Sequence, residues 1–217
     1  MLRRFRFGGR SVRLVAALGV VVTVLGSTLP ALGGGNVLLS SETPRGYSLT
    51  RAAADTAVFN VGPRTANTLS SLPAAFKGDP FQFLYVPQGG VASAFSVKRG
   101  TMLYVPVTYS DDSDGLPFPD VNDPEAVADY WFNPDFMGAQ SVAITVDGRV
   151  NELGPGYAVG TPAPGLPTGG NNYTVMAAFV SPMPKGTHTL TIAATFNGAL
   201  FGGETVGFVL SYTVNTL

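Results

Sequence analysis

Apolar and polar residues alternate along much of this chain, which is the pattern of strands with one buried face. The alternation is clearest in residues 187–196 and 205–214. In the first run, threonines at 187, 189, 191 and 195 alternate with mainly apolar residues, and in the second every even position is apolar. The positions predicted to be most buried are Leu190, Ile192, Phe208 and Leu210.

Shorter runs with the same period of two come earlier in the chain. They cover residues 81–85, 91–97, 103–109, 142–146 and 173–179. Asp147-Gly148 directly follows the fourth run and is a two-residue hairpin signal. Strands with short polar residues on the other face predict an all-β fold. We expect a two-sheet antiparallel β-sandwich, Ig-like or jelly-roll-like, with one or two short helices.

Two segments are predicted to be helical. Alanines between Ser48 and Phe59 indicate one short helix, and the second begins after Asp123 as N-cap and runs to about Phe132. Val127, Tyr130 and Trp131 lie at helical spacing, so the second helix is expected to pack over a sheet edge. The Gly- and Pro-rich stretch 154–170 has no period and is predicted to be an exposed loop.

The N-terminus has the pattern of an export signal. Five arginines lie between Arg3 and Arg13, and residues 14–41 carry no charge. Leu14–Gly26 forms an apolar core, and Ala31-Leu32-Gly33 is a small-x-small cleavage site. Residues 1–33 are therefore a cleaved signal peptide or an uncleaved anchor. We expect residues 34–80 to be a linker and short helix, and residues 81–217 to be the sandwich domain.

The order of motifs from about residue 80 onward resembles a group of uncharacterised bacterial exported β-sandwich proteins. The matching features are a buried strand at 102–109, an acidic loop and a short helix, Val146-Asp147-Gly148, and the run Pro184-Lys185-Gly186-Thr187-His188-Thr189-Leu190. The resemblance implies a β-sandwich that is secreted or held in the cell envelope of a bacterium. It implies no catalytic residues.

Charge and composition narrow the list of partners. The 217 residues include no cysteine, which excludes disulfides, cysteine nucleophiles and thiolate zinc sites. Five of the 13 Lys and Arg residues lie before residue 34, whereas all 14 Asp and Glu residues lie after it. The chain from residue 34 on therefore has a formal net charge of −6. Its cations are scattered, and we predict no nucleic-acid partner. A membrane is expected as a partner only through an uncleaved N-terminal segment.

An acidic stretch gives the one candidate metal site. Eight acids lie between Asp111 and Asp135, and residues 101–147 contain no Lys or Arg. A divalent cation would relieve this repulsion, and calcium suits hard oxygen ligands. The candidate ligands are Asp111, Asp112, Asp114 and Asp120, although the spacing is not that of an EF-hand loop. The alternative is that these acids are turn formers and solvated side chains.

Two more features bear on function. Tyr130 and Trp131 are a candidate stacking platform for sugar rings, with packing into the core as the alternative. His188 is the only histidine and begins a strand, which favours a hydrogen-bonded residue over a general base.

We therefore expect an exported non-catalytic module, structural or ligand-binding, with a glycan or an envelope protein as partner. A carbohydrate-binding module stays open as an alternative. So does a secreted hydrolase that uses paired carboxylates of the acidic loop.

Overall fold

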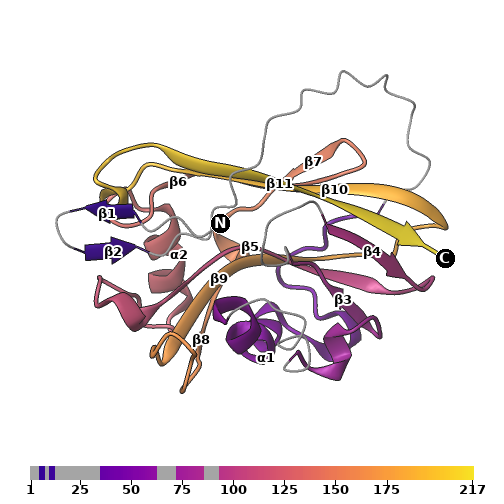
Figure 1. Ribbon diagram of the computed structural model, residues 1–217, viewed down its shortest axis with the longest axis horizontal. Coiled ribbons are helices and arrows are strands. Elements are labelled where there is room, and N and C mark those ends of the chain that lie inside the picture. The colour runs from indigo at the N-terminus through magenta and orange to yellow at the C-terminus, as the bar shows by residue number, and fades with distance from the viewer. Residues whose placement is uncertain (1–4, 8–9, 13–34, 63–71, 86–92) are drawn as a thin grey trace.

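The computed structural model describes residues 5–7, 10–12, 35–62, 72–85 and 93–217. The apolar core of the predicted export signal and Val91, the first residue of a predicted strand, lie outside these ranges. Two β-sheets face each other, so the predicted two-sheet β-sandwich is confirmed (Figure 1). Within the described ranges, no helix combines the length and the apolar character needed to cross a bilayer.

The five-stranded sheet has the order β4-β11-β10-β6-β7, and the four-stranded sheet has the order β3-β5-β9-β8. The first sheet consists of β4 (Ser93–Val97), β11 (Val206–Thr216), β10 (Gly186–Phe196), β6 (Ala139–Val146) and β7 (Arg149–Glu152). The second consists of β3 (Phe81–Phe83), β5 (Met102–Asp111), β9 (Asn172–Val180) and β8 (Ala158–Pro162). A separate short pair, β1 (Phe5–Phe7) and β2 (Arg10–Val12), is antiparallel.

Two edge pairs depart from the predicted antiparallel arrangement, because β3 runs parallel to β5 and β4 runs parallel to β11. The reason lies in the path of the chain. β4 follows β3 in sequence but lies in the other sheet, and the chain then returns to form β5. Since β3 and β5 are separated by a crossing of the sandwich and not by a hairpin, they run in the same direction.

The long hairpin of β10 and β11 follows the alternation in its sequence. Leu190 and Ile192 are buried at 0% and 1% exposure, and Phe208 is buried at 7%. Leu210 is only half-buried, so its prediction as one of the most buried residues was wrong. β4 pairs with β11 only from Tyr212 onward, which leaves the side chain of Leu210 at an opening between the sheets.

The turn between β6 and β7 forms as predicted. Asp147 and Gly148 both have positive φ angles, 48° and 82°, as a two-residue hairpin of this kind requires. Short 3-10 turns connect other elements, and the described ones are η1 (Pro44–Gly46), η3 (Ala74–Phe76), η4 (Asp112–Asp114), η5 (Pro155–Tyr157) and η6 (Ala199–Phe201).

The prediction of an exposed loop over 154–170 is wrong in part. This stretch contains β8, which pairs with β9, and Ala158, Gly160 and Thr161 are buried. Glycine and proline are uncommon in strands, so the sequence pattern did not predict this one. A Cβ on Gly160 would lie 2.8 Å from a methyl carbon of Val127, so glycine is what allows the second helix to lie close to β8.

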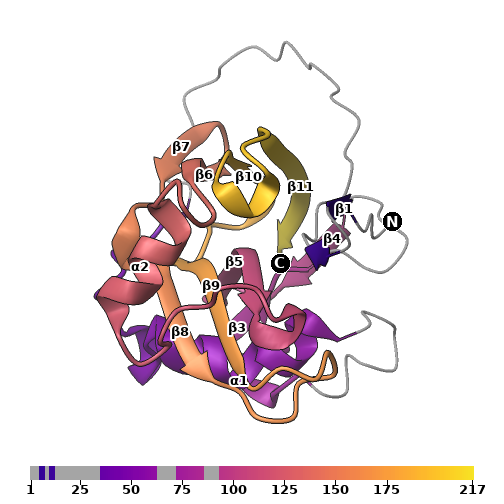
Figure 2. The ribbon, with the colours of Figure 1, turned by 90° about the vertical axis from the view of Figure 1, so that its left-hand side faces the viewer.

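Both predicted helices are present. α1 (Leu49–Val61) begins after Ser48, whose side chain accepts a hydrogen bond from the backbone N–H of Arg51. α2 (Pro124–Phe132) begins after Asp123, whose carboxylate accepts from the N–H of Glu125. Figure 2 shows α1 beneath the four-stranded sheet and α2 at one end of the sandwich.

The segment expected to be a linker and short helix contributes a third layer. Three alanines of α1 are completely buried against the outer face of the four-stranded sheet, where β8 and β9 are its main neighbours. Val37 forms an isolated β-bridge with Val180 at the end of β9. The four-stranded sheet is therefore covered on both faces, and every residue of β9 from Tyr173 to Val180 is buried.

Candidate functional site: a tyrosine-lined pocket between the sheets

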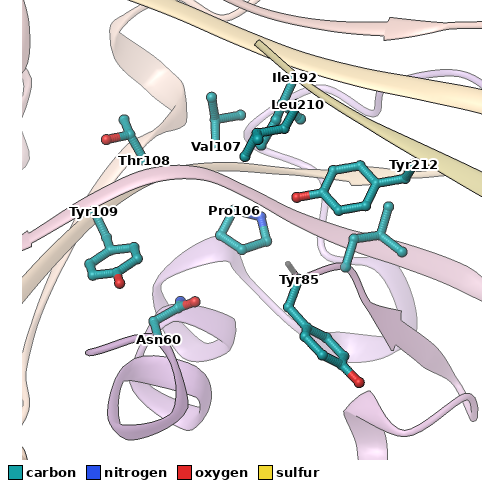
Figure 3. Close-up of a pocket in the computed structure, with 10 residues that line it drawn as sticks. Asn60, Tyr85, Pro106, Val107, Thr108, Tyr109, Ile192, Leu210 and Tyr212 are labelled. Atoms are coloured by element: carbon teal, nitrogen blue, oxygen red, sulfur yellow. The ribbon is translucent and has the colours of Figure 1, made fainter. Parts of the chain in front are cut away.

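A small pocket opens between β5 and β11, above the C-terminal end of α1 (Figure 3). Its volume is about 30 Å³, enough to hold at least one water molecule. The lining residues are Asn60, Leu84, Tyr85, Pro106, Val107, Thr108, Tyr109, Ile192, Leu210 and Tyr212. They come from both sheets, from α1 and from the end of β3, so the pocket exists only in the assembled fold.

An interruption in β5 creates this opening. β3 pairs with β5 only as far as Tyr104, and the register of β5 against β9 shifts between Pro106 and Thr108. Pro106 has no N–H to donate, which is why a proline within a strand is found at edges and bulges. The neighbouring strand ends where β5 bulges, and the side chains between Pro106 and Tyr109 border the space that remains.

The chemistry of the lining is neutral and amphipathic. Tyr85, Tyr109, Tyr212 and Asn60 line the pocket together with aliphatic residues, and none of the lining residues is charged. In Figure 3 the hydroxyl of Tyr85 points away from the other lining groups. The Tyr85 ring lies edge-on to the rings of Phe59 and Phe95, with ring centroids 5.4 Å apart in each case. Burial raises the pKa of Tyr85, so its phenol is a neutral hydrogen-bonding group at physiological pH.

Sequence reasoning did not identify this site. Their alternation with polar residues placed Tyr85, Tyr109 and Tyr212 on apolar strand faces. The three residues belong to separate segments and show no common spacing along the chain, so no sequence pattern joins them into a site. One local signal was present: Pro106 lies inside the predicted strand 103–109, and such a proline marks an edge or a bulge.

The predicted metal ligands lie between the end of β5 and the start of α2: Asp111 ends β5, Asp112 and Asp114 belong to η4, and Asp120 lies between η4 and α2. Asp111 Oδ1 accepts a hydrogen bond from Ser113 N (2.9 Å), and Asp120 Oδ1 accepts from Asn122 N (3.0 Å). Asp114 belongs to η4 and is half-buried. Among the described residues, no group of three or more Asp, Glu or His side chains is arranged to hold a metal ion.

Asp112 is the most engaged of the four predicted ligands. Its Oδ1 accepts from the backbone N–H groups of Asn171 (2.7 Å) and Asn172 (3.0 Å), and its Oδ2 accepts from Asn172 Nδ2 (2.8 Å). Burial raises the pKa of Asp112, but these hydrogen bonds outweigh burial and hold that pKa below its usual range. The carboxylate thus joins the β5 turn to the start of β9. Calcium would have to compete with these N–H donors, and its binding stays a prediction.

The predicted stacking residues are both buried. Trp131 is 0% exposed and Tyr130 is 4% exposed, so neither ring offers a face to a sugar unless α2 leaves the sheet. Trp131 Nε1 donates to Thr174 Oγ1 (2.9 Å), and the Tyr130 hydroxyl lies 3.0 Å from Ser110 Oγ. Burial raises the pKa of Tyr130 to about 12. The two aromatic residues attach α2 to the four-stranded sheet. This agrees with the alternative to sugar stacking, in which both side chains pack into the core.

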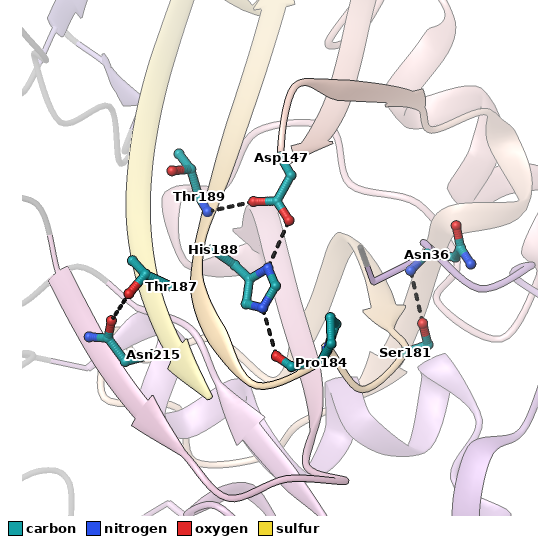
Figure 4. A network of polar contacts seen from close by, with 8 residues as sticks. All are labelled: Asn36, Asp147, Ser181, Pro184, Thr187, His188, Thr189 and Asn215. Carbon is teal, nitrogen blue, oxygen red and sulfur yellow. Dashed lines mark hydrogen bonds and ion pairs between the residues drawn. The ribbon is translucent and has the colours of Figure 1, made fainter. Parts of the chain in front are cut away.

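The single histidine takes part in a polar network at the other end of the sandwich (Figure 4). His188 Nδ1 lies 2.8 Å from Asp147 Oδ2, and Nε2 lies 2.8 Å from the backbone oxygen of Pro184. Asp147 Oδ1 also accepts from Thr189 N (2.9 Å). Burial lowers the pKa of His188, but the hydrogen bonds and the charge of Asp147 outweigh it and place that pKa above its ordinary value.

Comparisons with known proteins add little to this geometry. No protein-family model and no curated protein matches the sequence. Two solved structures are similar over 63% of this chain with 10% identity and a TM-score of 0.26: the solution structure of amebosin, covered over 96%, and the crystal structure of the cysteine protease inhibitor EhICP2 from Entamoeba histolytica, covered over 97%. At that TM-score, neither likeness carries an argument about this protein.

Proposed function

We propose that this protein is an exported, non-catalytic module that binds an uncharged ligand in the tyrosine-lined pocket. Export is supported by the arginines and the uncharged apolar stretch of residues 1–33. The module acts outside the cell or at the cell envelope of a bacterium. The observation that carries the binding role is the pocket itself, a concave site formed by both sheets at the point where strand pairing is interrupted.

The lining favours ligands with hydroxyl groups. Phenol and amide groups both donate and accept hydrogen bonds, and the rings and aliphatic side chains next to them favour contact with apolar CH groups. No charged lining side chain would pair with an ionic ligand. A volume of about 30 Å³ admits one small group, so we expect the end or the edge of a larger molecule to enter the pocket. A neutral glycan of the envelope has this chemistry.

A matched pair of variants tests the binding role. Leu210→Phe adds a ring at the mouth of the pocket, whereas Val209→Phe adds the same ring to the next residue, which is 52% exposed on the other face of β11. With an array of neutral oligosaccharides as the probe, we expect binding by the parent chain and the Val209 variant, and at least a tenfold loss in the Leu210 variant. No binding by the parent chain, or an equal loss in both variants, would contradict the proposed site.

Removing single hydroxyl groups provides a second measurement. Tyr212→Phe and Tyr109→Phe keep the rings and remove one polar group each from the pocket, while Tyr157→Phe removes a hydroxyl elsewhere. A lost hydrogen bond to an uncharged ligand costs about 0.5–1.5 kcal/mol, or roughly 2- to 12-fold in affinity. We expect that loss in the pocket variants only. A loss confined to the Tyr157 variant would place the ligand elsewhere.

A further inference from the structure

The chain that follows the predicted export signal is fixed at one end of the sandwich. Gly35 is buried so closely that a Cβ would lie 2.7 Å from Met183 Cγ. Asn36 N donates to Ser181 Oγ (2.8 Å), and Val37 is bridged to Val180 at the end of β9. The first residues after the predicted cleavage site are therefore held against the loop between β9 and β10.

Cationic side chains gather at the same end. Lys98 and Arg99 form the turn between β4 and β5, and Lys185 lies in the loop before β10; all three are exposed. The strand register brings the two loops together, because Thr216 of β11 pairs with Gly186 on one side and with Val97 on the other. This is the right-hand end in Figure 1, where the C-terminus is marked.

The acids lie mostly at the opposite end. The eight acids from Asp111 to Asp135 follow the end of β5 and surround α2, and Glu204 lies in the nearby loop between β10 and β11. At the cationic end, the exposed Asp79 lies beside the turn that carries Lys98 and Arg99, because Thr101 Oγ1 donates to Gly78 O and Met102 N donates to Pro80 O. Asp147 faces His188 there, and Glu42 accepts a hydrogen bond from Leu39 N. The described strand β2 (Arg10–Val12) contacts η4 at the acidic end. The separation of charge therefore concerns residues 35–217, and it gives that part of the molecule a defined electrostatic orientation.

The distance from the apolar segment to this end is short. Only residues 27–34 separate the apolar core of the export signal from Gly35. Fully extended, they span at most about 30 Å. A membrane that holds the apolar segment therefore keeps the cationic end close to its surface, at a high effective concentration.

We propose that this end, with Lys98, Arg99 and Lys185, is a membrane-facing surface that binds anionic lipid headgroups while residues 1–33 remain attached. The proposal uses only the export part of the proposed function and is independent of the pocket. A Lys or Arg near an anionic bilayer strengthens its attachment roughly fivefold. The attraction decays over about 8 Å at physiological ionic strength, so contact requires this end to lie on the headgroups.

The test uses the full chain reconstituted in lipid vesicles. Because the chain contains no cysteine, Thr187→Cys and Thr205→Cys each carry a single fluorescent label, at the cationic end and at the opposite end. Quenchers attached to the headgroups report which label lies at the surface. The vesicles are zwitterionic, or contain roughly a third anionic lipid, at low and at high salt. An alkaline wash reports separately whether the chain stays inserted.

We expect quenching at position 187 and not at position 205, only with anionic lipid, and lost at high salt. Lys98→Gln with Lys185→Gln should weaken the contact roughly 25-fold. Arg51→Gln removes the same charge as Lys185→Gln from the exposed side of α1 and should leave the contact unchanged, whereas the single Lys185 variant loses roughly fivefold. Equal quenching of both labels, indifference to lipid charge, an equal effect of the Arg51 variant, or loss of the chain in the alkaline wash would overturn the proposal.

Discussion

The contacts of His188 favour the protonated form of its ring. Nδ1 faces the carboxylate of Asp147 and Nε2 faces the carbonyl oxygen of Pro184, both at 2.8 Å. A neutral ring can donate to only one of these two oxygens, whereas the imidazolium form can donate to both. The side chain is 9% exposed, so a neutral ring would leave one nitrogen lone pair directed at an acceptor, with no water to separate them.

The direction of the pH dependence follows from the raised pKa. In the unfolded chain, His188 titrates near its ordinary value of about 6.5. Because the folded pKa is higher, the stabilisation is fully present below about pH 6.5 and is lost as the pH rises through the folded pKa. Each unit of difference corresponds to about 1.4 kcal/mol of stability that depends on pH.

The perturbation is His188→Gln, which retains much of the volume and one amide donor but carries no charge. Hydrogen bonds between charged groups contribute about 1.5–3 kcal/mol, and Asp147 is partly exposed, so we expect a loss of about 2 kcal/mol at pH 5.5. Urea unfolding from pH 5.5 to 9 should show the two proteins converging as the parent loses its advantage. Asp147→Asn is the matched control, because asparagine tolerates the positive φ of the turn.

Proton NMR provides the decisive measurement, since one histidine gives one titrating set of ring signals. We expect a pKa above 6.5 in the parent chain and a lower one in the Asp147→Asn variant. A folded-state pKa at or below 6.5, or a His188→Gln variant with the pH dependence of the parent, would refute the reasoning.

The remaining predictions concern packing, the acidic turn and metal binding. Ile192→Ala should cost about 2–5 kcal/mol in urea unfolding, and Leu210→Ala under about 2 kcal/mol, because only Ile192 is fully buried; equal costs would contradict this. Asp112→Ala should destabilise by about 1–3 kcal/mol at neutral pH, and the difference should vanish as the pH falls through the lowered pKa of that carboxyl. Gly160→Ala should cost about 1–3 kcal/mol, because its Cβ would press on α2, while Gly154→Ala, with open space around it, should be nearly neutral in the same thermal melts. If the acidic turn binds calcium, the melting temperature should be higher in about 10 mM calcium than in magnesium or chelator; identical melts would contradict this.

The local pattern of apolar and polar residues predicted those elements that have one face in the core and the other in solvent. The hairpin of β10 and β11 has one face on the core and one in solvent, so period-two alternation was visible and the predicted strands are confirmed. α2 was predicted from its cap and its apolar spacing because both signals are local. β8 was missed because Gly160 serves the packing of a helix that lies far away in sequence, and glycine lowers the strand signal.

The candidate sites show the same limit. The acids after β5 lie close together in sequence, so the pattern predicted them as a group, but the partners of Asp112, Asn171 and Asn172, lie about 60 residues further along. The pocket depends on three strands that approach one another only after folding. Trp131, the one tryptophan, was a candidate stacking residue, but it is buried, and its N–H is accepted by Thr174 on a strand about 40 residues further along. The spacing of residues along the sequence indicates a site only when those residues lie on one helix, strand or turn.

The two proposed binding surfaces, the pocket and the cationic end, lie apart on the sandwich. Tyr212, in the pocket, lies four residues before Thr216 along β11, which corresponds to about 13 Å of strand. That length exceeds the Debye length of about 8 Å, so headgroup charge at the cationic end is largely screened at the pocket. The pocket opens beside the strands, between β5 and β11, and not at their ends. If the cationic end lies on a bilayer as proposed, the pocket opens to the side of the sandwich and stays accessible to a ligand.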